Sequence, residues 1–91
     1  PYIPHMRSDQ VPTMKLNLKD ISQRGIGIFV SDANIHFFKK GKFVELVAMD
    51  KLDLPRPLLA QVVYVARQRG GRIEQYRGSE NRVGHKMLDL I

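Results

Sequence analysis

Alternating apolar and polar residues are the main structural signal in this chain. Apolar side chains occupy every second position in residues 14–18, and the alternation resumes in residues 26–30. A period of two is typical of half-buried β-strands. The intervening DISQRG, residues 20–25, contains an Asp, a Ser and a Gly, which favour turns. We therefore predict strands at 13–19 and 25–30, joined as a β-hairpin or as a corner between two strands.

Further strands are expected in the rest of the chain. Residues 43–49 are apolar on nearly both faces, residues 58–66 form a Val-rich segment, and residues 82–88 would close the sheet. A shorter return strand is expected at 73–76. The remaining segments predict turns or loops, at 31–34, 35–38, 39–42, 50–57, 68–71 and 78–81. Residues 35–38 could instead form the edge of the next element. The loop at 50–57 is expected because two prolines cannot donate ladder hydrogen bonds.

About six short strands with little helical periodicity predict an all-β fold, either a small antiparallel β-barrel or a sandwich. The pattern leaves room for a short C-terminal helix that begins at 89–91. Residues 1–12 contain three prolines and no periodicity, so we expect an irregular N-terminal arm. The 91 residues are enough for one domain, at 13–91, with a modest core.

The charge of the chain favours an anionic partner. The formal net charge is +6, and five arginines lie between residues 67 and 82. The planar guanidinium offers paired donors to phosphate or guanine, although a solvated strand edge and loop explains the same arginines. The chain has no cysteine and no apolar run long enough to span a membrane, and no signal-peptide pattern is seen. We therefore expect a cytoplasmic location without membrane insertion.

Patterns typical of catalysis are missing from the sequence. The three histidines, at 5, 36 and 85, lack the spacing of metal ligands. A Gly-x-Ser-x-Gly motif is not found, and Gly25-x-Gly27 lacks the third glycine of a dinucleotide fingerprint. We expect neither an enzyme nor a resident cofactor or metal.

Two segments carry a family resemblance. DISQRGIGIF, residues 20–29, resembles the Asp/Asn-x-Ser-x-x-Gly signature of the PilZ domain, and NRVGHKML, residues 81–88, resembles the last strand of that family. The resemblance covers roughly residues 14–88 and implies a small barrel of the split-barrel type that binds the bacterial second messenger cyclic di-GMP. The flagellar-brake type of PilZ domain is one form that it allows.

The residues of the hairpin suit this ligand. The Asp20 carboxylate can accept the paired N–H donors of a guanine edge, while the Ser22 hydroxyl and the bare backbone at Gly25 suit phosphate oxygens. Arg24 could add a phosphate contact or point into water, and Arg82 could face the same pocket. The simpler alternative is that Asp20 and Ser22 only tie the turn to itself.

The resemblance also implies an Arg-x-x-x-Arg signature in the N-terminal arm, and this signature is incomplete. Arg7 is present, but Val11 stands four residues later. If the alignment follows the Val-Pro pair at 11–12 instead, Met6 and Gln10 occupy both positions.

Three functions follow from these observations. The first is a cyclic di-GMP sensor that changes the geometry of its arm and partner surface, and so regulates motility or surface attachment. The second is a ligand-free interaction module that contacts a protein of the motility, pilus, secretion or polysaccharide machinery through its basic face or through Phe37 and Phe38. The third, with the weakest support, is RNA or single-stranded DNA binding by the arginine-rich segment around Gly70 and Gly71, which would show a steep salt dependence.

Overall fold

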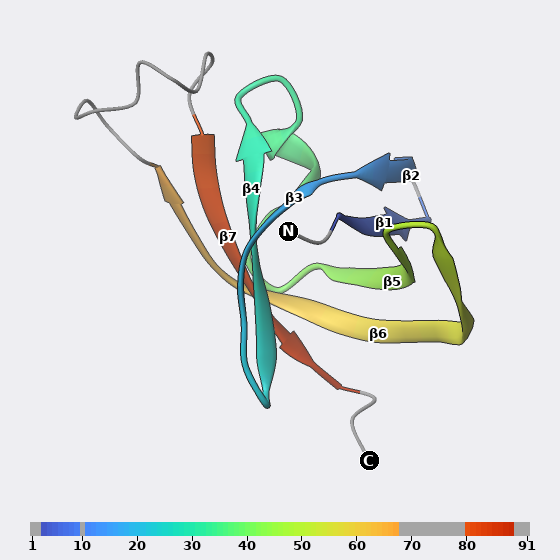
Figure 1. Ribbon diagram of the computed structural model, residues 1–91. Coiled ribbons are helices and arrows are strands. Elements are labelled where there is room, and N and C mark those ends of the chain that lie inside the picture. Colours follow the sequence, from blue (N-terminus) through green and yellow to red (C-terminus); the bar gives the residue numbers. More distant parts are fainter. Residues whose placement is uncertain (1–2, 10, 68–79, 89–91) are drawn as a thin grey trace.

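The computed structural model describes residues 3–9, 11–67 and 80–88, which form one antiparallel sheet of seven strands (Figure 1). The strand order is β2-β1-β5-β6-β7-β4-β3. The strands are β1 (Pro4–Ser8), β2 (Val11–Lys15), β3 (Asn17–Ile21), β4 (Gly25–Ser31), β5 (Phe43–Met49), β6 (Leu52–Arg67) and β7 (Glu80–Met87), and a short 3₁₀ helix, η1 (Ile35–Phe37), follows β4. The all-β prediction is confirmed, with one strand more than the expected six.

The sheet curls into a barrel-like shape because two segments each pair on two sides. β2 and β3 stand at opposite ends of the strand order, yet only the buried Leu16 separates them along the chain. The N–H of Leu16 donates to the carbonyl of Pro4, 2.9 Å away. β6 pairs with β5 through its first part and with β7 through its second part. Figure 1 shows β2 running directly into β3 across the curled sheet.

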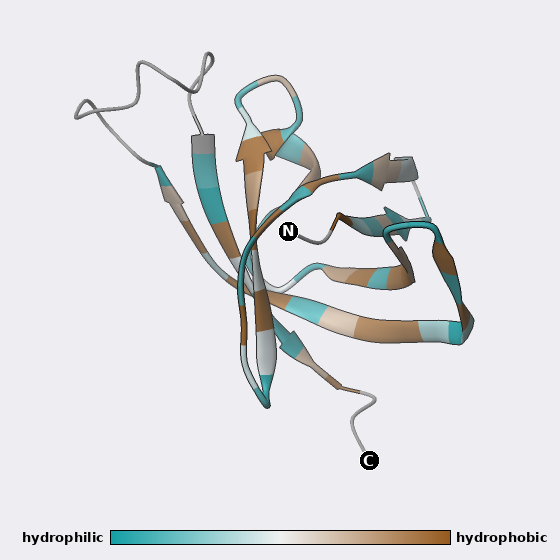
Figure 2. Ribbon diagram, viewed as in Figure 1, coloured by the Kyte–Doolittle hydropathy of each residue, from teal (hydrophilic) through white to brown (hydrophobic). Residues whose placement is uncertain are grey.

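The core fills the inner face of this curled sheet. Ile26, Ile28 and Val30 of β4 alternate toward it, and the N-terminal strand contributes Met6. Figure 2 shows the apolar residues as brown bands along the strands. The remaining buried apolar residues of this cluster are Leu16, Phe38, Val44, Leu46, Ala60, Val62 and Val83. Because the inner face is apolar, the polar groups available for binding lie on the outer face or at the strand ends.

The prediction of an irregular arm at 1–12 is wrong for the part that the structure describes. β1 pairs with both β2 and β5, and β2 begins at Val11. The prolines are compatible with these strands because Pro4 is the first residue of β1 and Pro12 lies in β2, an edge strand. The arm is therefore part of the sheet.

The prediction of a loop at 50–57 is also wrong, since β6 begins at Leu52. The register pairs Leu46 with Leu58 but Ala48 with Asp53, so β6 carries extra residues between these pairs. Pro55 and Pro57 both lie in that irregularity, where the strand does not need their missing N–H groups for regular ladder hydrogen bonds. The strand therefore accommodates prolines that would interrupt a regular ladder.

The other strand predictions mostly hold. β4 and β5 match the predicted 25–30 and 43–49, and β6 contains the predicted 58–66. The predicted strand at 13–19 is divided at Leu16 between β2 and β3, and β7 begins at Glu80, inside a predicted turn. The expected Gly-Gly tip at 68–71, the strand at 73–76 and the helix at 89–91 lie outside the described residues.

Candidate functional site

The hairpin at 20–25 is present and joins β3 to β4. Ile21 lies opposite Ile26, and the N–H of Ser22 donates to the carbonyl of Gly25, 2.9 Å away. The carbonyl of Arg24 accepts a hydrogen bond of 3.0 Å from the backbone N–H of Met87. The tip is thus fixed to the end of β7, while the side chains of Ser22 and Arg24 remain exposed.

Asp20 lies on β3 directly opposite Gly27 of β4. A Cβ atom added to Gly27 would lie 2.6 Å from Asp20 Oδ1, so the carboxylate covers the glycine backbone. Asp20 Oδ2 also accepts an ion pair from Lys19 Nζ, and 59% of the Asp20 side chain is exposed. The carboxylate therefore has a defined position on the sheet and remains accessible to a ligand.

The same row continues across two more strands. Gly27 lies opposite Gly84 of β7, and Gly84 lies opposite Tyr64 of β6. A Cβ at Gly84 would collide with the Tyr64 ring, which therefore covers this glycine as Asp20 covers Gly27. We call this row of four residues, Asp20, Gly27, Gly84 and Tyr64, the glycine row. It lies on the outer face, because the neighbouring residues of β4 and β7 point into the core.

Cationic side chains lie on both sides of the glycine row. Arg82 and Lys86 are two residues from Gly84 in either direction, so they share its face of the sheet. Arg82 is opposite Phe29 of β4 and Ala66 of β6. Its Nε is buried without a hydrogen-bond partner among the described residues. An anionic ligand that approached the glycine row would meet positive charge on either side.

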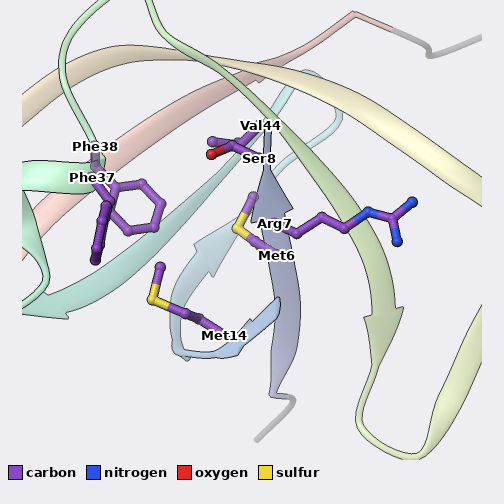
Figure 3. Close-up of a pocket in the computed structure, with 7 residues that line it drawn as sticks. All are labelled: Met6, Arg7, Ser8, Met14, Phe37, Phe38 and Val44. Atoms are coloured by element: carbon purple, nitrogen blue, oxygen red, sulfur yellow. The ribbon is translucent and has the colours of Figure 1, made fainter. Parts of the chain in front are cut away.

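Five of the six predicted site residues thus lie on the hairpin or on the adjoining outer face, and Arg7 does not join them. Arg7 lies on β1, where its Nε pairs with Oε1 of Glu45 on β5 at 3.0 Å. The two side chains are 46% and 42% exposed. In Figure 3 the Arg7 side chain points away from the neighbouring pocket.

That pocket lies at another part of the fold and is mostly apolar. It is lined by Met6, Arg7, Ser8, Met14, Phe37, Phe38 and Val44 (Figure 3). Ser8 Oγ is buried there without a hydrogen-bond partner among the described residues. Because the Arg7 guanidinium points away from the pocket, the lining offers only one side-chain hydroxyl and apolar contact, whereas a nucleotide needs a guanine acceptor and cations near its phosphates. An exposed carboxylate and cationic side chains lie on the outer face instead.

His85 belongs to the core and not to the site. Its ring meets Phe38 edge to face, with ring centroids 6.0 Å apart. Burial lowers the pKa of His85 to about 4; interactions with the backbone of Ile26 and Val83 oppose this only in part, and neither ring nitrogen reaches a hydrogen-bond partner in the described structure. The imidazole is therefore neutral near pH 7. Within residues 3–9, 11–67 and 80–88, no cluster of side chains suited to a metal ion is found.

Tyr64, Gly27 and Gly84 were not among the predicted site residues. The available signal was a glycine inside each of two predicted strands, because a strand glycine often marks a close approach of another group. Tyr64 gave no such signal, since it lies within a Val-rich segment whose pattern indicates only a strand.

Comparisons with known proteins agree with this architecture. The sequence profile described as the PilZ domain matches residues 2–90. Searches of curated proteins and of solved structures gave no significant match. The helices that the structure describes include none with the length and apolar character needed to cross a membrane. Since the match covers nearly the whole chain, this protein belongs to the PilZ domain family, a family of cyclic di-GMP receptors.

Proposed function

We propose that this chain binds cyclic di-GMP on the outer face of β3, β4 and β7. The observation that carries the proposal is the exposed Asp20 carboxylate, held over the backbone of Gly27. A guanine edge presents two adjacent N–H donors, and one carboxylate can accept both. Arg82 and Lys86 lie on the same face of β7, where their positive charges favour the phosphates of the same ligand.

The other residues of the hairpin have roles in this proposal. The Ser22 hydroxyl and the backbone at Gly25 bind phosphate oxygens, and Arg24 adds a cation at the tip. These side chains are exposed, and the tip is fixed by its hydrogen bonds to β7 and across the turn. Arg82 contributes its guanidinium from β7. A fixed backbone with exposed side chains favours binding, because little ordering is needed there.

Arg7 supplies a further contact from β1. It first has to exchange Glu45 for the ligand, and this exchange costs little because both partners are about half exposed. The rearrangement of β1 would change the surface offered to a protein partner. We propose that this change regulates motility or surface attachment, through a partner from the motility, pilus or polysaccharide machinery in the cytoplasm.

Calorimetric titration with cyclic di-GMP tests the proposal, with GTP and linear di-GMP as controls. Asp20→Ala should weaken binding about thirtyfold, on the order of 2 kcal/mol, because the guanine donors lose their acceptor. Asp53→Ala is the matched control, since Asp53 is an exposed aspartate on β6 outside the glycine row. Binding that is unchanged in Asp20→Ala would contradict the site, and absence of binding by the wild-type chain would contradict the function.

A ligand-free interaction module is the second candidate. The specific observation in its favour is that Arg7 is paired with Glu45, while Val11 stands where the second arginine of the arm is expected. The apolar surface expected at Phe37 and Phe38 needs correction, because Phe38 is buried in the core and only 2% exposed. A partner whose capture is indifferent to cyclic di-GMP would favour this function.

A further inference from the structure

Tyr64 is an exposed aromatic residue on the face that carries Asp20. The residue is 43% exposed although its ring covers Gly84. The position of a Cβ on Gly84 is closest to three consecutive ring atoms, Cδ2, Cε2 and Cζ, all within 2.7 Å. Three consecutive ring atoms can all be this close to the Cβ position only when that position lies over the face of the ring. One face of Tyr64 therefore lies on the sheet, and the other is turned outward.

The outward face of Tyr64 and the carboxylate of Asp20 lie next to each other. They cover Gly84 and Gly27 respectively, which are direct cross-strand neighbours. The Cα atoms of such a pair are about 5 Å apart. This separation is comparable with the width of a purine, so one base can stack on the ring while its edge reaches the carboxylate. Because Gly27 and Gly84 are both glycines, neither places a side chain between the Tyr64 ring and the Asp20 carboxylate.

We infer that Tyr64 is a base-stacking residue, and that the guanine whose N–H edge binds Asp20 stacks on the outward face of the Tyr64 ring. The inference rests on the proposed function and adds a fourth strand, β6, to the binding face. Stacking accepts any base because every base has a π-face, whereas the carboxylate accepts only an edge that carries donors. Tyr64 therefore provides affinity, and Asp20 selects guanine.

A purely structural role for Tyr64 makes a different prediction. An aromatic ring that covers a strand glycine stabilises the sheet, whether or not a ligand binds. In that case, substitution of Tyr64 would lower the unfolding temperature and leave the affinity of the folded protein unchanged. Affinity and stability therefore have to be measured on the same variants.

The test is calorimetric titration of Tyr64→Leu, Tyr64→Phe and Phe43→Leu with cyclic di-GMP. Tyr64→Leu should bind about tenfold more weakly, since the aromatic surface on which the base stacks is lost. Tyr64→Phe keeps the ring and should bind within about twofold of the wild type. Phe43→Leu is the control, because Phe43 is a 52% exposed aromatic residue of β5 outside the glycine row. Thermal unfolding of each variant reports the structural contribution separately.

The outcomes separate this inference from the proposed function. If the wild-type chain binds cyclic di-GMP and Tyr64→Leu binds equally well, the stacking role is wrong and the proposed function stands. If the wild-type chain does not bind, both are overturned. Should Tyr64→Leu fail to fold, nuclear Overhauser contacts between the Tyr64 ring and guanine H8 in the wild-type complex take its place. Their presence supports stacking, and their absence in a saturated complex overturns it.

Discussion

The ring of Phe38 contacts the imidazole of His85 edge to face, and this places a titratable group against the apolar core. Phe38 follows η1, whereas His85 lies on β7, opposite Ile26 of β4 and Val62 of β6. His85 is 3% exposed, and its ring nitrogens have no hydrogen-bond partner in the described structure. Protonation would place an unpaired positive charge among apolar side chains.

The stability of the domain should therefore fall in mild acid. The pKa of His85 is lowered to about 4 in the folded state, whereas an unfolded histidine titrates near its ordinary value of 6.5. Between these values the unfolded chain binds the extra proton, so stability decreases as the pH falls from above 6.5 toward 4. We expect a loss of about 3 kcal/mol over this range.

Urea denaturation at a series of pH values checks this expectation, with His85→Leu as the comparison. Carboxylates also titrate in acid, so the informative quantity is the difference between wild type and variant. The free energy of unfolding of the wild type minus that of His85→Leu should fall as the pH decreases from 6.5 toward 4, because only the wild type contains a histidine whose protonation favours the unfolded chain. Parallel pH profiles for the two proteins would show that His85 does not determine the acid sensitivity.

Gly84→Ala should destabilise the sheet, because the new Cβ collides with the Tyr64 ring. Overpacking of this kind costs about 1–3 kcal/mol. The cost should shrink when Tyr64→Ala is present, since the ring is then absent. A double-mutant cycle by urea denaturation measures this coupling. Additive effects of the two substitutions would contradict the contact between ring and glycine.

The sequence was informative where the fold is determined by neighbouring residues. The alternation of a strand and the residues of a turn are both visible within a few consecutive positions. For this reason β4, β5 and the hairpin at 20–25 were predicted correctly. The resemblance of that hairpin to a known signature also singled out Asp20 as a binding residue, which stays a prediction. Neither the local pattern nor the resemblance requires knowledge of which distant strands pair.

The remaining features depend on pairing between distant strands. The register between β6 and β7 shifts between Val62 and Tyr64, and this irregularity helps to decide which β6 side chains face outward. Simple alternation cannot show such a shift, so Tyr64 was missed. A loop was wrongly predicted around the prolines of β6 because the register shift between β5 and β6, which accommodates them, is equally absent from the local pattern. The pairing of Arg7 with Glu45, 38 residues later, was equally invisible.

Gly27→Ala should separate binding from stability. Its Cβ would approach Asp20 Oδ1, the end of an exposed side chain that can move aside. We expect the free energy of unfolding to change by less than about 1 kcal/mol. The carboxylate would lose its position, so affinity for cyclic di-GMP should fall about tenfold. Thermal unfolding and calorimetry on the same sample test both parts, and full affinity would show that the position of Asp20 over Gly27 is not needed.

Glu45→Gln should increase the affinity for cyclic di-GMP, because it releases Arg7 from its ion pair. Exposed ion pairs contribute about 0.2–1 kcal/mol, so the gain should be at most about fivefold if Arg7 has to leave Glu45 before it contacts the ligand. The unfolding temperature should change little for the same reason. Arg7→Ala should weaken binding, and adding Glu45→Gln to Arg7→Ala should give no further gain. A gain that persists without Arg7 would mean that Glu45 acts by general repulsion of the anionic ligand and that Arg7 has no direct part in binding.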